Sequence, residues 1–282
     1  MNKVLITGGC SFSETISDHI DTWPRHLARA MPDYQHVSKG MGSQGNGLIS
    51  RSIIHACTEH TNKDLLVGIV WSSPLRHDFY LADCNIGTNK DGWMENPTGF
   101  IQHKNWVILN HNWSNEYAKT YYGMFHDNIG ASINTLEHIL RTQWYLKQNN
   151  IKYFMSTYTA DVLSNVNAHV DTKHLYDLID FDKFLPVDGI YEWVKDNIGK
   201  SGFPIAGDNH PSSDAHKQFT DSVILPFIED KCYGSTSGSN PLSQGSTPWS
   251  SAKHAGIAQL VEQLICNHQV GSSNLPAGTT KQ

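Results

Sequence analysis

LITGGCSFSE (residues 5–14) is the stretch that decides the fold. An apolar run that contains β-branched residues and ends in two glycines predicts a buried strand that runs into a tight turn. A turn of this kind serves one of two chemistries in proteins. It either cradles the phosphates of a nucleotide or presents a nucleophilic side chain at the end of a strand.

The remainder of the chain alternates between strand and helix patterns. Residues 65–71 (LLVGIVW) and 151–157 (IKYFMST) are further apolar runs typical of parallel strands. Helical spacing follows Thr22, which we predict as an N-cap, and follows Asn46 or Gly47. The order predicts an α/β fold with a parallel sheet and helices on both faces. Further helices are expected over 115–149, with a break near 130, and over 172–180, 190–198 and the stretch after Ser212 or Ser213.

Composition excludes several classes of protein. The 282 residues carry a formal net charge of −6 and no run of Lys or Arg, so we expect no nucleic-acid partner. The five cysteines are widely spaced, and no pair has the spacing of a metal site, so we expect reduced thiols, no metal and no cofactor. No signal-peptide core and no apolar run of about 20 residues is present, which predicts a cytoplasmic protein without a membrane span.

The phosphate cradle is the less favoured interpretation of the opening stretch. A dinucleotide fingerprint needs three glycines, and here Ser11 and Glu14 follow the glycine pair. Glu14 would place a negative charge where a pyrophosphate binds. An NAD(P)-binding oxidoreductase, which the spacing of Tyr191 and Lys195 also suggests, is kept only as a minor alternative.

A nucleophilic serine accounts for the stretch better. Ser11 follows a predicted buried strand, and the glycine pair leaves room beside it for a substrate. Its base is expected in GDNHPSSDAH (residues 207–216), where His210 precedes a predicted helix and Asp208 is close enough to orient the imidazole. His216 is the rival base, but it falls inside that helix, and we expect it to face solvent or Phe219. The alternative for Ser11 is a simple helix cap.

These blocks together resemble the SGNH (GDSL-type) hydrolase family. Gly9-Cys10-Ser11 stands in the place of the family's Gly-Asp-Ser block, and Asp208-x-His210-Pro211 in the place of its Asp-x-x-His-Pro block, one residue shorter. The resemblance covers residues 1–230 and implies a flavodoxin-like three-layer α/β/α fold. It also implies that Ser11, His210 and Asp208 form a catalytic triad.

The resemblance further implies an oxyanion hole. In SKGMGSQGN (residues 38–46) the best match to the family's donor glycine is Gly42, and Asn46 shapes this loop. The family's third block carries a donor Asn, and here Ser73 or Ser72 stands in its place. We therefore expect the N–H groups of Ser11 and Gly42 and the hydroxyl of Ser73 to bind the oxyanion.

The expected function is that of a serine esterase acting on a small-molecule or glycan ester, with an O-acetylated carbohydrate as the first guess. Asn46 and Arg76 are candidates for substrate binding, although Arg76 can instead pair with Asp78. Trp71 and Trp106 are candidates for stacking on a sugar, with core packing as the alternative. A non-catalytic SGNH-like binding module is the main competing hypothesis. Composition does not decide the oligomeric state.

Two segments are set apart from this predicted domain, which covers residues 1–232. Residues 81–114 predict an irregular insertion with a hairpin around WVIL (106–109), at the position where specificity is expected. Residues 233–282 begin with a Gly/Ser/Pro-rich linker. Back-translated, residues 255–280 resemble a transfer RNA gene, with its arms in order, which predicts read-through into such a gene in a compact, phage-like genome. The alternative is a short amphipathic helix over 257–265.

Overall fold

The fold is described from a computed structural model of the chain. It describes residues 2–15, 20–80, 93–95, 101–103, 106–111, 116–164, 166–205 and 209–233. Of the two compact units into which the chain divides, these residues belong to the first, Met1–Ser235. Asp208 and the tail beyond Tyr233 lie outside the described residues, so their predicted roles stay predictions.

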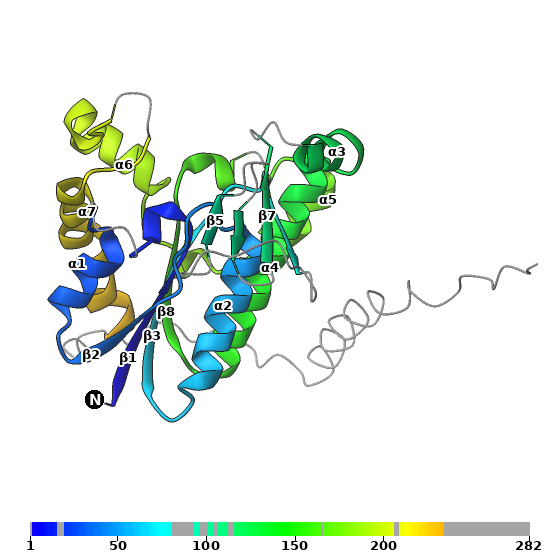
Figure 1. Cartoon of the computed structure of the whole chain (residues 1–282). Helices are drawn as coiled ribbons and strands as arrows, with labels where there is room; N and C mark the ends of the chain where they lie inside the picture. The colour runs from blue at the N-terminus through cyan, green and yellow to red at the C-terminus, as the bar shows by residue number, and fades with distance from the viewer. Residues whose placement is uncertain are drawn as a thin grey trace, which may run out of the picture. The chain divides into compact units, whose positions relative to one another are not determined.

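A parallel sheet forms the centre of this unit (Figure 1). Its strands lie in the order β2-β1-β3-β8. Strand β1 pairs with both β2 and β3, and its end, Gly8, lies opposite Ile69. The apolar runs seen in the sequence are buried here because helices cover both faces of the sheet. The strand bounds are β1 Lys3–Gly8, β2 Tyr34–Ser38, β3 Asp64–Trp71 and β8 Lys152–Thr157.

Helices form a layer on each face of the sheet, which confirms the predicted three-layer α/β/α fold. Helices α2 (Asn46–Glu59) and α4 (Asn128–Gln148) pack on one face, and α1 (Trp23–Ala30), α6 (Ile190–Asn197) and α7 (Ser213–Phe219) on the other (Figure 1). The final helix continues from α7 as η5 Thr220–Ile224, α8 Leu225–Phe227 and η6 Ile228–Cys232. Shorter elements are η1 Ser11–Ser13, η2 Ala160–Val162, α5 Val170–Tyr176, η3 Phe181–Lys183 and η4 Gly199–Gly202.

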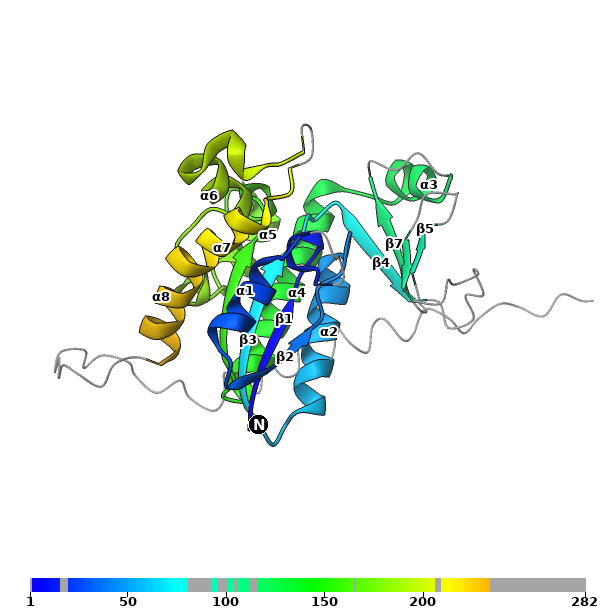
Figure 2. The same ribbon diagram turned by 60° about the vertical axis from the view of Figure 1, so that its left-hand side comes forward.

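A second, antiparallel sheet follows β3 (Figure 2). Its order is β4-β7-β6-β5, with bounds β4 Arg76–Tyr80, β5 Trp93–Glu95, β6 Ile101–His103 and β7 Trp106–Asn110, and α3 (Glu116–Met124) follows it. The hairpin predicted around 106–109 is present as β6 and β7. The described part of the predicted irregular insertion is strand, because pairing with β4 extends the hairpin into a sheet.

The ends of the helices agree with the sequence signals only in part. Helix α1 begins where predicted, but the Thr22 hydroxyl donates to the Glu14 carbonyl and does not cap the helix. The break predicted near 130 falls just before α4, where the Asp127 carboxylate accepts the N–H groups of Ile129 and Gly130. Within the described part of the chain, no helix has both the length and the apolar character of a membrane span.

Candidate active site

Ser11 and His210 meet at the carboxyl end of the central sheet. The His210 Nε2 atom lies 2.7 Å from the Ser11 Oγ atom, across 199 residues of sequence. Ser11 opens η1 directly after β1, and His210 precedes α7, whose N-cap Ser212 accepts the N–H of Ala215. This distance is that of a hydrogen bond, the contact that a serine nucleophile and its base require.

The glycine pair before Ser11 allows the chain to pack closely. A Cβ atom on Gly8 would lie 2.7 Å from the Ile53 side chain, and one on Gly9 would lie 2.4 Å from the Ser13 hydroxyl. Gly9 also has a φ of 151°, which disfavours any side chain. Ser13 in turn accepts a hydrogen bond of 2.9 Å from the Trp23 indole. The glycine pair therefore lets η1 pack closely against the sheet and α1. This packing role is separate from the expected one, which was to leave room for a substrate beside Ser11.

Phe12 is a site residue that the sequence analysis missed. Its buried ring lies 5.1 Å from the His210 ring and 5.4 Å from the Tyr158 ring, measured between centroids. The His210 imidazole therefore packs against the residue that follows the nucleophile. The signal in the sequence was an aromatic residue directly after the predicted nucleophile. The direction in which its side chain points, however, depends on the tertiary fold.

His216 lies inside the protein, so of the two expected orientations, toward solvent or toward Phe219, the first is wrong. Its side chain is 1% exposed, and its ring centroid lies 6.3 Å from that of Phe12. Burial, with smaller contributions from the nearby His26 and His210, lowers the pKa of His216 to about 3. A neutral histidine packed beneath Phe12 supports the site from within the core.

The burial of His216 predicts that acid lowers the free energy of unfolding. The unfolded chain protonates His216 near pH 6.5 and the folded chain only near pH 3, so stability is lost as the pH falls through this window. We expect His216→Gln to reduce the loss of unfolding free energy between pH 7 and pH 5 by about 2 kcal/mol. Urea denaturation at pH 7, 6 and 5 measures it. His55→Gln, at a side chain that is 70% exposed, is the control. An equal fall of the unfolding free energy with pH in wild type and His216→Gln would contradict the prediction.

The loop after β2 packs against η1. The Lys39 N–H donates to the Thr7 carbonyl and the Met41 N–H to the Gly9 carbonyl. Gly40 lies so close to Ser13 that a Cβ would overlap its carbonyl oxygen, 2.0 Å away. These contacts fix the loop that carries Gly42 against η1.

Glu14 lies close to Gly42 and to His210. Burial raises the pKa of Glu14, while the Gly42 backbone and the charge of His210 act in the opposite direction. The role expected of the Gly42 N–H as an oxyanion donor stays a prediction. Glu14 entered the sequence analysis only as an argument against phosphate binding.

Asn46 fixes the backbone at the end of β3. Its side-chain amide donates to the Ser72 carbonyl at 2.9 Å and to the Thr135 hydroxyl at 3.1 Å, and its oxygen accepts the Ser72 N–H at 2.7 Å. The residue is buried. These contacts agree with the expected role in shaping the loop, and they leave the Asn46 side chain engaged with protein groups.

The two serines at the end of β3 differ in environment. Ser72 is fully buried, and its hydroxyl accepts a hydrogen bond of 2.8 Å from Arg76. Ser73 is partly exposed, and its Oγ accepts the Leu75 N–H at 3.1 Å. Both hydroxyls keep a proton to donate, but only that of Ser73 belongs to a residue that is not fully buried, so Ser73 is the more accessible of the two.

Arg76 lies over the ring of Tyr158, with 5.6 Å between its Cζ atom and the ring centroid. Its Nε atom is buried and has no hydrogen-bond partner among the described residues. The alternative ion-pair partner, Asp78, directs its carboxylate to the N–H groups of Gly45 and Leu48 at the start of α2. Burial raises the pKa of Asp78 to about 6, opposed by these two bonds and by the charge of Arg76.

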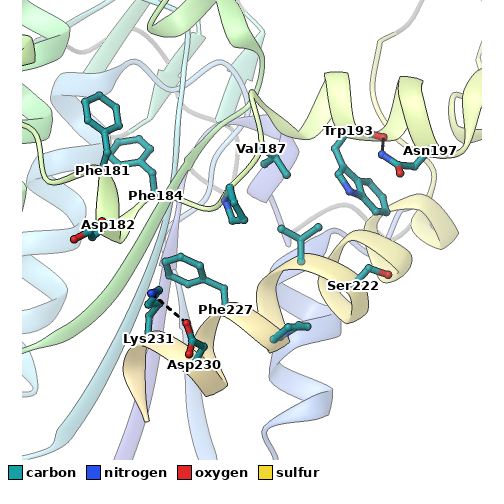
Figure 3. Close-up of a pocket in the computed structure, with 13 residues that line it drawn as sticks. Phe181, Asp182, Phe184, Val187, Trp193, Asn197, Ser222, Phe227, Asp230 and Lys231 are labelled. Carbon is teal, nitrogen blue, oxygen red and sulfur yellow. Dashed lines mark hydrogen bonds and ion pairs between the residues drawn. The ribbon is translucent and has the colours of Figure 1, made fainter. Parts of the chain in front are cut away.

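The remaining candidates lie apart from this group. Trp71 is fully buried, which contradicts a role in stacking on a sugar and supports the core-packing alternative. A cavity of about 640 Å³ lies on another part of the unit. Figure 3 shows side chains that line it, such as Phe184, Trp193 and Phe227. None of the predicted catalytic residues lines this cavity.

No family model and no curated protein matches the chain. Solved structures with similarity include the crystal structure of TesA, with a TM-score of 0.45, 13% identity, and coverage of 80% of this chain and 98% of that chain. A putative lipolytic protein of the G-D-S-L family from Desulfitobacterium hafniense DCB-2 has a TM-score of 0.41 and 14% identity, with coverage of 78% of this chain and 97% of that chain. The acetyl xylan esterase AlAXEase has a TM-score of 0.39 and 12% identity, with coverage of 78% of this chain and 96% of that chain.

Proposed function

We propose that this protein is a serine esterase of the SGNH type. The observation that carries the proposal is the distance of 2.7 Å between the Ser11 Oγ and the His210 Nε2. The Oγ attacks the ester carbonyl carbon while its proton passes to His210. Collapse of the tetrahedral intermediate expels the alcohol, which takes that proton. Water, deprotonated by His210, then hydrolyses the acyl-enzyme and frees the acid.

The supporting groups have separate roles in this mechanism. Asp208 orients His210 and stabilises its charged form. The N–H groups of Ser11 and Gly42 and the hydroxyl of Ser73 hold the oxyanion. Asn46 acts on this hole through the Ser72 backbone, which it fixes from both its N–H and its carbonyl. Arg76, held by Ser72 and Tyr158, binds an oxygen of the substrate.

A small acyl group on a carbohydrate remains the proposed substrate. Tyr80, which is 58% exposed, packs edge-on against Trp106 in the second sheet, with 5.2 Å between the ring centroids. Half-exposed aromatic rings of this kind offer an apolar face beside a polar rim, which suits a sugar ring. Arg51, with its Cζ atom 5.7 Å from the Trp106 ring, adds a hydrogen-bond donor to that surface.

A non-catalytic SGNH-like binding module is the second candidate. It is favoured by one observation, the serines at positions 72 and 73, where the family resemblance implies an Asn as oxyanion donor. In such a module the ester or glycan would bind without turnover.

The experiment that separates the two is labelling with a fluorophosphonate probe, together with hydrolysis of p-nitrophenyl acetate. We expect wild type to label and turn over, and Ser11→Ala to lose both. Ser132→Ala, at a serine on α4 whose hydroxyl donates to the Asn128 carbonyl, is the matched control and should behave like wild type. Absence of labelling in a folded wild-type protein would favour the binding module.

A further inference from the structure

Arg76 lies at the edge of the central sheet where Ser11 also lies. Strand β3 ends at Trp71, and Arg76 follows it at the start of β4. Because β3 is parallel to its neighbour β1, the end of β3 lies at the same edge of the sheet as the end of β1, which Ser11 follows. This is the edge at which open parallel sheets bind their ligands.

A row of ring contacts connects Arg76 to His210. The Arg76 Cζ atom lies 5.6 Å from the centroid of the Tyr158 ring. The Tyr158 ring lies 5.4 Å from the Phe12 ring, which lies 5.1 Å from the His210 ring, between centroids. Tyr158 follows β8, and its N–H donates to the Trp71 carbonyl at 3.0 Å, which holds it at the end of β3. Two aromatic rings therefore lie between the guanidinium and the imidazole.

The Arg76 guanidinium has a hydrogen-bond donor that the protein does not use. Its Nη1 donates to the Ser72 hydroxyl at 2.8 Å, whereas its buried Nε has no partner in the part of the chain that the structure describes. Asp78, the acid nearest to Arg76 along the chain, directs its two carboxylate oxygens to the N–H groups of Gly45 and Leu48. Asp78 therefore acts on Arg76 through its charge and not through a hydrogen bond. A partly buried cation with an unsatisfied donor destabilises the protein unless a ligand compensates it.

We propose that Arg76 binds a carboxylate of the substrate, so that the ester that this protein hydrolyses is an anionic one. A carboxylate is the acceptor that best matches the planar donors of a guanidinium. One guanidinium matches one negative charge, and the chain's formal net charge of −6 disfavours a ligand with several. This inference rests on the proposed esterase function and adds the charge of its substrate. The carboxylate belongs to either the acyl or the alcohol part of the ester, and the experiment distinguishes the two.

The test uses two matched pairs of esters, each with a charged and an uncharged member. In p-acetoxybenzoate and its methyl ester the alcohol part differs in charge. In the p-nitrophenyl monoester of adipate and in p-nitrophenyl hexanoate the acyl part differs. The measured quantity is the ratio of kcat/KM for the charged ester to kcat/KM for the uncharged one. Comparison of this ratio between wild type and a variant cancels the difference in intrinsic reactivity between the two esters.

We expect Arg76→Gln to lower this ratio about ten-fold in one of the two pairs, through the loss of charge-assisted hydrogen bonds to the carboxylate. The pair affected shows which part of the ester carries the charge. Arg76→Lys keeps the charge but loses the planar donors, so it should lower the ratio less. Melting temperatures check that each variant is folded.

Arg141→Gln is the matched control. Arg141 also donates to a serine hydroxyl, that of Ser50 at 3.1 Å, and its buried Nη2 also has no partner among the described residues. It lies on α4 against α2, and we expect its replacement to leave the wild-type ratio in both pairs.

A ratio that Arg76→Gln leaves at the wild-type value in both pairs, or that Arg141→Gln lowers equally, overturns the inference. If Arg76→Gln does not fold, the same criterion applies to Arg76→Lys. These outcomes leave the esterase proposal standing, because the wild-type protein still hydrolyses the esters. If the wild type hydrolyses none of the four esters and is not labelled by a fluorophosphonate probe, the esterase proposal falls and this inference falls with it.

Discussion

His210→Ala is expected to lower kcat/KM for p-nitrophenyl acetate by about 10²–10⁴-fold, the contribution of a well-placed general base. The Nε2 atom of His210 lies 2.7 Å from the Ser11 Oγ, so its removal leaves the hydroxyl without an acceptor for its proton. The loss should fall mainly on kcat, because His210 acts on the serine and not on the bound ester.

The measurement is steady-state hydrolysis, with the melting temperature of each variant taken alongside. His55→Ala, at an exposed histidine on α2, is the control and should retain wild-type rates. A folded His210→Ala protein that keeps more than about a tenth of the wild-type kcat/KM would show that another group is the base.

Asp78→Ala is expected to lower the free energy of unfolding by about 3 kcal/mol. The Asp78 carboxylate accepts the N–H of Gly45 at 3.0 Å and that of Leu48 at 2.9 Å, although it comes from β4 and not from the helix that it caps. Its removal leaves two N–H groups in a buried place without acceptors, each at a cost of about 1–3 kcal/mol.

Asp127→Ala provides the matched comparison. The Asp127 carboxylate also accepts two N–H groups at a helix start, those of Ile129 and Gly130, but it does so at an exposed site. Water replaces it there, so we expect a loss of about 1 kcal/mol. Urea denaturation of both variants measures the difference. Equal losses of unfolding free energy in the two variants would mean that the position of Asp78 gives its helix cap no more stability than an exposed cap has.

The fold and the contact between Ser11 and His210 could be predicted from the sequence because their signals are local. The apolar run before Gly8 and that at 65–71 predict buried strands wherever they occur, and they pair in parallel as expected. Ser11 and His210 each stand beside a recognisable block at the end of such an element. The order of the blocks along the chain was enough to predict that they meet.

The supporting contacts were not accessible, because each joins residues whose proximity only the tertiary fold creates. Asp78 accepts the N–H of Gly45, the N-cap of α2, from 33 residues further along the chain, so no N-cap pattern in the sequence includes it. His216 has the polar identity of a surface residue, yet it lies beneath Phe12. Gly40 approaches Ser13 so closely that a Cβ atom would lie 2.0 Å from the Ser13 carbonyl oxygen, and no pattern in the sequence indicates this contact.

The separation of Ser11 and His210 by 199 residues has a consequence for the synthesis of the protein. Ser11 leaves the ribosome near the beginning of translation, and His210 arrives only after the whole central sheet has been made. Contacts of such long range are slow to form. Under the proposed mechanism, a nascent chain carries an unactivated serine until α7 docks beside η1, and esterase reactivity would report that the chain through α7 has been made and folded.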